Sequence, residues 1–369
     1  MNILSKLSLL KTTIGIIGNQ NANVARLIYE AHRLGIKIGI YTDKNDPAVR
    51  SADFKIIGKL NDKAHLKEFA NECQTVVYVD GSGISAGLIN YLRQFTNVPQ
   101  GSKVLDLIND RAILRVLLDS FNIKSLPYKT VFNLDDVKQS LSDSHDPLYI
   151  QPVQTSYVHQ NGVLVTDPSQ LGHLSHMFNG ETYLLEALPK RSRYFKLTLI
   201  KSNSGVTLLP VIEEHYQGPQ LKMADLSPKV SSEVSDQFTK ITDNLTSHLD
   251  YQGCLTLSLI LTPDGQVYVD NVELPFELVN NIYNLTPDNL YKTFLHSVFG
   301  LPVQSKSLHQ VWLLSVIDQH NLSQAQKLLS NNSSVNFDLN SLINHHKGYA
   351  LMHADTLDNV KKQFKADKL

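Results

Sequence analysis

Thr13-Ile14-Gly15-Ile16-Ile17-Gly18 is an apolar run that ends in glycine, and it opens a regular alternation of strands and helices. The elements predicted after it are a helix over 22–34, a strand over 37–41, a helix over 62–73, a strand over 75–79 and a helix over 84–94. Apolar strands separated by helices are typical of a parallel sheet. The first hundred residues therefore predict an α/β domain with a Rossmann-like layout.

The glycine motif of dinucleotide-binding folds is incomplete in this chain. Gly15 and Gly18 are followed by Asn19-Gln20-Asn21-Ala22-Asn23, so the later glycines of the G-x-G-x-x-G pattern are missing. Side chains at those positions would keep a pyrophosphate away from the helix N-terminus. Asp43, near the end of the second strand, is explained by a turn. These residues argue against a nicotinamide-dependent dehydrogenase.

The pattern changes after residue 110, from strands separated by helices to hairpins. A helix is predicted over 110–121, and residues 148–186 read as strand, loop, strand, helix and strand. Two strands between 194 and 212 meet at Asn203-Ser204-Gly205, which is a hairpin turn. A long helix over 229–248 precedes a second hairpin, with strands over 254–261 and 266–271. The tail, 302–369, alternates weakly between strand and helix.

Composition and charge narrow the function classes. The chain has 369 residues, which favours two or three domains, and its formal net charge is −1 with dispersed basic residues. That distribution excludes a nucleic-acid-binding face. No apolar run approaches the roughly 18 to 20 residues that span a bilayer. The start, MNILSKLSLLKTT, is interrupted by Lys11 and has no cleavage site, so we expect a cytoplasmic protein that does not bind a membrane.

The cysteines and histidines do not predict a metal site. Cys73 and Cys254 lie far apart in apolar contexts, which favours buried packing thiols over a disulfide. His173 and His176 are three residues apart on the predicted helix, but no carboxylate lies near them in sequence. A solvated helix face is the favoured interpretation of this pair.

Several segments, in the right order, resemble the carboxyaminoimidazole ribonucleotide synthetases, which are ATP-grasp enzymes of purine biosynthesis. These segments are Asp46-Pro47-Ala48 with Ala52-Asp53, Asn109-Asp110-Arg111 with Leu126-Pro127-Tyr128, the hairpin over 253–271, and Gly348-Tyr349-Ala350-Leu351-Met352 with Ala354-Asp355-Thr356-Leu357. Each match is short, but their order and spacing together are specific. The resemblance covers nearly the whole chain.

The resemblance implies an α/β fold with three parts. A Rossmann-like pre-ATP-grasp domain is expected over 1–105, an ATP-grasp domain of two subdomains over 106–300, and a small C-terminal closing sheet over 301–369. ATP would lie between two antiparallel sheets. The family reaction phosphorylates bicarbonate with ATP and transfers the carboxyl group to the amine of aminoimidazole ribonucleotide. A homodimer is also implied, because family members are commonly dimers.

The resemblance also assigns ligand contacts, with ATP and Mg²⁺ as the expected cofactors. The implied nucleotide contacts are Arg111, Gln151, Glu186, Leu188, Asp270 and Asn271, the implied metal ligand is Asp270, and the implied substrate contacts are His345, His346 and Lys347. Structural roles compete with some of these assignments. Arg111 can pair with a neighbouring acid, and Glu186 can be a solvated residue at a strand end.

Many of the family's catalytic positions carry other residues here. Gln151 stands where the family has a lysine, and Ser258 stands where the hairpin has its first metal-binding glutamate. The Asn-Glu pair of the second hairpin strand aligns with Asp270-Asn271. The glycine-rich loop that closes over the phosphates aligns with 155–161 and keeps only its tyrosine. Residues 274–281 lack the arginine and histidines of the corresponding family segment.

Phosphoryl transfer from ATP needs cations on the phosphates and carboxylates on the magnesium. The substitutions therefore favour a divergent ATP-grasp protein with lost or much reduced ATP-dependent carboxylation. Its role would be to bind a nucleotide, a small molecule, a second copy of itself or an active relative. The alternative is an active ATP-dependent carboxylate–amine ligase, with the family reaction or a changed substrate.

Overall fold

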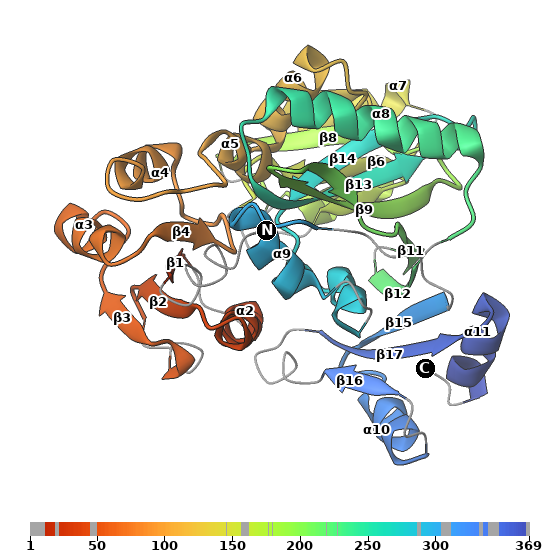
Figure 1. Cartoon of the computed structure of the whole chain (residues 1–369). Coiled ribbons are helices and arrows are strands. Elements are labelled where there is room, and N and C mark those ends of the chain that lie inside the picture. Colours follow the sequence, from red (N-terminus) through yellow and green to blue (C-terminus); the bar gives the residue numbers. More distant parts are fainter. Residues whose placement is uncertain are drawn as a thin grey trace.

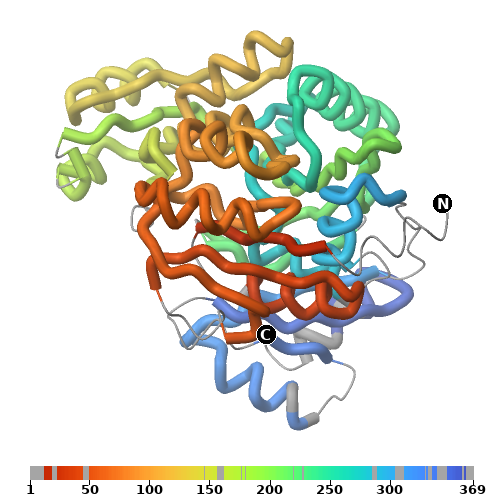
Figure 2. Tube along the Cα trace, turned by 60° about the vertical axis from the view of Figure 1, so that its left-hand side comes forward, coloured from red at the N-terminus to blue at the C-terminus, as the bar shows by residue number. Residues whose placement is uncertain are grey.

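The structure is a computed structural model. It describes residues 12–18, 22–44, 50–144, 146–155, 162–175, 177–178, 180–218, 220–226, 228–285, 289–303, 311–331, 335–338 and 347–366. Within these ranges the chain forms three β-sheets, with helices packed between and around them (Figure 1). The sheets follow one another along the chain, and the small middle sheet projects to one side (Figure 2).

The N-terminal sheet is parallel, with the strand order β3-β2-β1-β4. Its elements are β1 (Thr13–Ile17), α2 (Ala22–Arg33), β2 (Lys37–Thr42), β3 (Phe54–Ile57), α3 (Lys63–Asn71), β4 (Thr75–Tyr78) and α4 (Ala86–Leu92). The predicted alternation of strands and helices is confirmed. β3 was not predicted, because an edge strand of four residues is too short to show a period. Asp62 caps α3 by accepting a hydrogen bond from the backbone N–H of His65.

Gly15 serves packing at the centre of β1. A Cβ at this position would lie 2.7 Å from both the Cys73 Sγ atom and the Phe69 ring. We expect Gly15→Ala to lower the free energy of unfolding by about 1 to 3 kcal/mol, because the added methyl group overpacks the core. Urea denaturation followed by circular dichroism measures this loss.

Gly87 in α4 is the matched control for that substitution. A Cβ there would meet only the Ser85 Oγ atom, at 3.8 Å. Gly87→Ala should stabilise the protein by up to about 1 kcal/mol, because alanine favours a helix. Equal effects of the two substitutions would contradict the packing role of Gly15.

The middle sheet is antiparallel, with the strand order β5-β8-β6-β7. Its strands are β5 (Tyr128–Val131), β6 (Leu148–Pro152), β7 (Val163–Val165) and β8 (Tyr183–Ala187), and the helices near it are α5 (Lys103–Asn109), α6 (Arg111–Ser120), α7 (Leu134–Asp143) and the 3₁₀ helix η2 (Pro168–Leu174). Val137 of α7, Ile150 of β6 and Leu171 of η2 share one apolar cluster. The helix predicted within 148–186 is therefore the 3₁₀ helix η2.

The third sheet is the largest, with nine strands among the described residues in the order β14-β13-β9-β11-β12-β15-β17-β16 and β10 paired to β9. The strands are β9 (Arg193–Ser202), β10 (Gly205–Leu208), β11 (Ile212–Gln217), β12 (Gln220–Leu226), β13 (Gly253–Leu261), β14 (Val267–Glu273), β15 (Val311–Ile317), β16 (Asn336–Asp338) and β17 (Gly348–Ala354). The remaining helices are α8 (Ser232–His248), η3 (Val279–Leu285), α9 (Leu290–Val298), α10 (Leu322–Asn331) and α11 (Leu357–Ala366). Both predicted hairpins are confirmed.

The C-terminal strands extend the large sheet. β15 pairs with β12, and β17 and β16 follow at the outer edge. An ion pair between Arg26 of α2 and Asp338 of β16 links the N-terminal part to these strands. The division into 1–105, 106–300 and 301–369 stays a prediction.

The two faces of the large sheet differ in polarity, because side chains alternate along a strand. Leu197 of β9 and Leu257 of β13 lie on the face that packs against Phe238 of α8, whose helix crosses the top of Figure 1. Lys196 and Ser258 lie on the opposite face, in register with each other. This polar face positions the candidate site.

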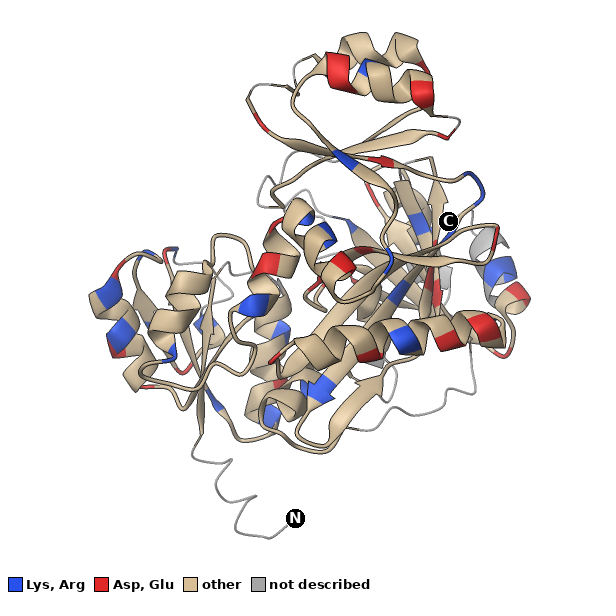
Figure 3. Cartoon of the chain, turned by 90° about the horizontal axis from the view of Figure 1, so that it is seen from above, with Lys and Arg blue, Asp and Glu red and all other residues tan. Residues whose placement is uncertain are grey.

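Other predictions concern the whole chain. None of the described helices is long and apolar enough to cross a membrane. Cys73 and Cys254 are free and buried, as predicted, and burial raises the pKa of each thiol to about 12. Acidic and basic residues are interspersed over the elements (Figure 3). His173 is exposed, whereas His176 lies outside the described residues.

Candidate functional site

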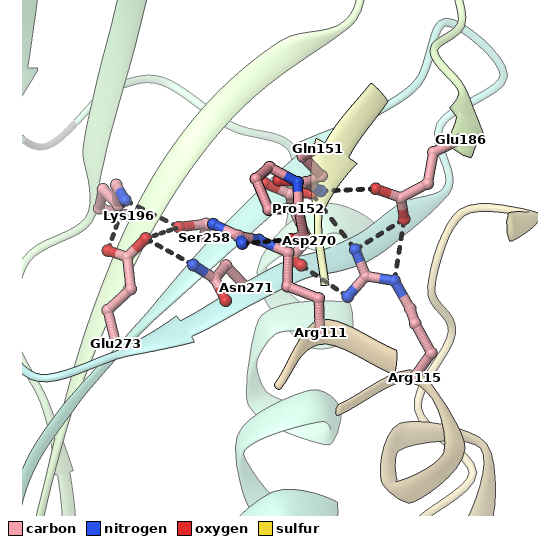
Figure 4. Close-up of polar contacts among 10 residues, drawn as sticks. All are labelled: Arg111, Arg115, Gln151, Pro152, Glu186, Lys196, Ser258, Asp270, Asn271 and Glu273. Atoms are coloured by element: carbon pink, nitrogen blue, oxygen red, sulfur yellow. Dashed lines mark hydrogen bonds and ion pairs between the residues drawn. The ribbon is translucent and has the colours of Figure 1, made fainter. Parts of the chain in front are cut away.

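A buried arginine joins the middle sheet to the large sheet. Arg115 of α6 is fully buried and donates to the Glu186 Oε1 atom through Nε at 2.8 Å and Nη2 at 2.6 Å. Its Nη1 atom donates to the backbone carbonyl of Asp270 on β14 at 2.7 Å. The Gln151 side-chain amide donates to the other Glu186 oxygen at 2.9 Å. Both carboxylate oxygens of Glu186 are therefore satisfied within the protein (Figure 4).

A buried lysine forms the centre of a second polar group, next to the first. The Lys196 ammonium donates to Ser258 Oγ and to Glu273 Oε2, at 2.7 Å each. Ser258 Oγ donates to Glu273 Oε1 at 3.2 Å, and the Asn271 amide donates to the same oxygen at 3.1 Å. Three strands of the large sheet thus bring these side chains together (Figure 4).

Arg111 lies beside both groups at the start of α6, where Asp110 caps the helix. Its Nη1 atom donates to the backbone carbonyl of Pro152 at 2.7 Å. Arg111 forms no ion pair with any carboxylate in the described ranges. Burial lowers the pKa of its guanidinium, although the charges of Asp270 and Glu273 oppose that shift. The pairing with a neighbouring acid that competed as an explanation of Arg111 is not found among the described residues.

The two polar groups and Arg111 together form what we call the inter-sheet site. Its nine residues are Arg111, Arg115, Gln151, Glu186, Lys196, Ser258, Asp270, Asn271 and Glu273. Burial raises the pKa of Glu186 to about 7, even though Arg115 acts in the opposite direction. Burial opposes the charge on Lys196 as well, but Glu273 and Glu214 outweigh it and raise the pKa of the ammonium. Lys196 correspondingly holds the pKa of Glu273 below its ordinary value.

The structure brings most of the predicted contacts together. Gln151, Glu186, Asp270 and Asn271 all belong to the inter-sheet site, and the Glu186 side chain is buried rather than solvated at a strand end. The backbone N–H of Leu188, another of the implied nucleotide contacts, donates to the carbonyl of Pro147 at 2.8 Å. The Asp270 carboxylate lies 3.5 Å from Arg115, which competes with a metal ion for it. The contacts of these residues with a ligand stay predictions.

Some predicted positions are placed elsewhere or not described. Lys347 is exposed, one residue before β17 begins. His345 and His346 lie outside the described residues, as do Asp46-Pro47-Ala48 and residues 156–161 of the predicted closing loop. Thr155, at the start of that loop, is held by hydrogen bonds to the backbone of α5.

Three charged residues of the inter-sheet site were not predicted from the sequence. Arg115 follows Arg111 by one helical turn on α6, and this spacing is a signal that both point the same way. Lys196 is the charged residue within the apolar strand run Phe195–Ile200. Glu273 lies two residues after Asn271 on the same face of β14. These signals identify Arg115, Lys196 and Glu273 as candidates without any alignment.

A separate cluster on β11 and β12 has the composition of a metal site. Glu213, His215 and Asp225 bring their ligand atoms within 4.8 Å of one another. Arg193 already holds both oxygens of Glu213, at 2.7 Å each, and His215 is hydrogen-bonded to Asp225. These contacts satisfy the groups without a metal ion.

Two antiparallel sheets that face each other through a buried polar layer, preceded by a parallel α/β unit, define an ATP-grasp fold, and comparison with solved structures agrees. The ADP complex of an N5-carboxyaminoimidazole ribonucleotide synthetase has a TM-score of 0.84 at 18% identity, covering 97% of this chain and 96% of that one. The carboxyaminoimidazole ribonucleotide synthase of Aspergillus clavatus, complexed with ATP, has a TM-score of 0.82 at 12% identity and covers 96% and 97%.

Sequence comparison points in the same direction. The N5-carboxyaminoimidazole ribonucleotide synthase of Bacillus subtilis (strain 168) is 20% identical over 298 residues, which is 80% of this chain and 78% of the relative. No family model matches the chain. The chain is a distant relative of the N5-carboxyaminoimidazole ribonucleotide synthases, and the resemblance predicted from its motifs is confirmed.

Proposed function

We propose that this chain derives from the purine-biosynthetic ATP-grasp ligases, binds an adenine nucleotide at the inter-sheet site, and has lost most or all ATP-dependent carboxylation. The likeness to structures that hold ADP or ATP supports the choice of ligand. The observation that carries the loss of catalysis is the internal pairing of charge. Arg115 is paired with Glu186, and Lys196 is paired with Glu273.

Internal pairing opposes phosphoryl transfer for an electrostatic reason. The transition state spreads charge over the phosphoryl oxygens, and cations that face those oxygens stabilise it. A guanidinium that is already paired with a carboxylate attracts a phosphate only weakly, because the two charges of the pair largely cancel. Removing one preorganised contact costs about 10² to 10³ in rate. Gln151 also donates to Glu186, so one of the two N–H donors at the position of the family's lysine is already used.

Magnesium does not fit the residues that the sheet provides. Mg²⁺ binds near-octahedral oxygen ligands that include carboxylates. The hairpin strands β13 and β14 provide Ser258, Asn271 and Glu273 on this face, and an ammonium lies within hydrogen-bonding distance of that single carboxylate. Asp270 faces Arg115 instead. We therefore derive no catalytic step through a metal ion.

A steady-state assay tests the loss of activity. The assay contains ATP, Mg²⁺, bicarbonate and aminoimidazole ribonucleotide. We expect ADP production to be at least about 10²- to 10³-fold slower than that of the Bacillus subtilis relative, because this is the rate cost of losing one preorganised electrostatic contact. Calorimetry with ATP on the same sample measures binding separately. ADP release at a rate comparable with the relative would overturn the proposal and favour the active carboxylate–amine ligase.

The environment of Arg111 is the reason to keep an active carboxylate–amine ligase as the second candidate function. Its guanidinium forms no ion pair within the described part of the chain, so it is the cation of this site best able to meet a phosphate. Arg111→Gln should weaken nucleotide binding by about 10- to 100-fold, which is the usual effect of losing a charged hydrogen bond. Calorimetry measures this change, and unchanged affinity would contradict the placement of phosphates beside α6.

The partner role remains part of the proposal. We propose a homodimer, in line with the resemblance, or a complex with an active relative. Sedimentation equilibrium distinguishes these states, since a homodimer sediments with twice the mass of one chain without added protein.

A further inference from the structure

The oxygen atoms around Lys196 are arranged as they would be around a bound cation. Ser258 Oγ on β13 and Glu273 Oε2 on β14 each lie 2.7 Å from the ammonium nitrogen. Lys196 is opposite Ser258, and Ser258 is opposite Asn271, so the three residues form one row across the sheet. The Asn271 Oδ1 atom is buried and has no hydrogen-bond partner within the described structure.

The Lys196 ammonium is the counter-charge of the Glu273 carboxylate in this group. Glu273 is one negative charge, and Ser258 and Asn271 are neutral. Glu214, buried on the neighbouring strand β11, and Glu277 also interact electrostatically with this ion pair, and burial raises the pKa of both carboxyl groups. A divalent ion placed among these oxygens would meet the Lys196 ammonium at close range and be repelled. The Lys196 ammonium therefore already occupies the position at which the oxygen atoms of Ser258, Asn271 and Glu273 could hold a metal ion.

The ammonium retains donor capacity. A lysine has three N–H donors, and Ser258 and Glu273 account for two of them. Its side chain is 10% exposed, whereas that of Arg115 is fully buried. Lys196 therefore retains one N–H donor that an anionic oxygen of a ligand can accept.

We infer that the Lys196 ammonium replaces the divalent cation of the hairpin, so that the chain binds the diphosphate of an adenine nucleotide without a metal ion. This inference rests on the proposed nucleotide role for its ligand, and on the geometry alone for the exclusion of metal. It makes Lys196 a ligand-binding residue and Glu273 a positioning residue that holds the ammonium.

A metal titration tests the exclusion of metal without any nucleotide. Electron paramagnetic resonance of Mn²⁺ should show no binding to the wild-type protein at millimolar metal. The Lys196→Ser/Ser258→Glu variant removes the ammonium and adds a second carboxylate beside Glu273. Mn²⁺ should therefore bind to this variant, and Mg²⁺ should raise its melting temperature by several degrees. Tight Mn²⁺ binding by the wild type that Ser258→Ala or Glu273→Gln abolishes would overturn the inference.

Calorimetry with ADP tests the metal-free ligand. The affinity of the wild type in EDTA and in Mg²⁺ should agree within about twofold, because no contact runs through a metal. Lys196→Gln should lower the affinity in EDTA by about 10- to 100-fold. Lys201→Gln is the matched control on the same strand, since its ammonium binds the carbonyls of Thr246 and Leu249. Its ADP affinity should not change.

The outcomes separate the two proposals. ADP binding that needs Mg²⁺ overturns the inference and leaves the proposed nucleotide role standing. ADP binding in neither buffer overturns the nucleotide role, and the Mn²⁺ titration then decides the assignment of Lys196 alone. If Lys196→Gln does not fold, Lys196→Gln/Glu273→Gln removes both charges together and takes its place. An unchanged affinity of that variant in EDTA would also overturn the inference.

Discussion

Arg115→Met lowers the free energy of unfolding by about 3 to 5 kcal/mol at pH 8, which is the usual cost of leaving one member of a buried ion pair without its partner. Arg115 is fully buried and Glu186 is 2% exposed. Methionine keeps much of the volume but provides no donor for Glu186 or for the carbonyl of Asp270. Urea denaturation at several pH values measures the loss.

The loss should shrink as the pH falls. Burial raises the pKa of Glu186 to about 7, above the unfolded value of about 4.3, so the folded protein binds the extra proton between these two values. The contribution of this group to stability is therefore greatest below about pH 4.3 and is lost as the pH rises through 7. Without Arg115 the folded pKa rises further. At pH 5.5 Glu186 is neutral in both proteins, so the variant loses less.

Arg193→Met is the control for this prediction. Arg193 holds Glu213 through two hydrogen bonds, but 40% of its side chain is exposed to solvent. Solvent screens such a pair, so the expected loss is about 0 to 1 kcal/mol. A loss for Arg115→Met as small as this, independent of pH, would show that the inter-sheet pair does not hold the two sheets together.

Glu273→Met should also destabilise the protein by about 3 to 5 kcal/mol, because it removes the carboxylate that is hydrogen-bonded to the buried Lys196 ammonium. Ser258 and Asn271 lose an acceptor at the same time. Lys196→Met/Glu273→Met should recover most of that loss, since apolar side chains of similar size replace a buried ion pair at little cost. A double-mutant cycle by urea denaturation gives the coupling between the two residues.

The pH dependence of this pair has the opposite sign. The folded pKa of Glu273 lies below its ordinary value, so the pair stabilises the protein fully above the unfolded pKa of about 4.3. That stabilisation is lost as the pH falls through the folded pKa. The difference between wild type and Glu273→Met should therefore vanish in acid. Additive single effects, with no recovery in the double variant, would mean that the residues do not act as a pair.

The hydrophobic pattern predicted the elements that position the site, because periodicity is a local property of the chain. The helix α8 and the strands β9 and β13 were found from apolar residues at the spacing of one buried face. The 3₁₀ helix η2 was predicted only as a helix, and α7 and α9 were not recognised. Their apolar positions depend on packing against other elements rather than on a strong local period.

Counting residues from the hairpin turn could not predict which carboxylate of β14 lies on the polar face. A register shift after Ser258 places Asn271 opposite Ser258 and leaves Asp270 as the extra residue of a bulge. Counting residues along the family pattern therefore favoured Asp270 as the acid of this face. The bulge brings Glu273 to Lys196 and Ser258 instead.

The sequence alone determined that the chain folds as a parallel α/β unit followed by antiparallel hairpins, because alternating polarity specifies strands and helices wherever they lie. The partners of the charged residues were decided only by the tertiary structure. Arg115 and Glu186 are separated by 71 residues, and Lys196 and Glu273 by 77. Pairing over such separations depends on the register of the strands and on the approach of the two sheets, which no local pattern encodes.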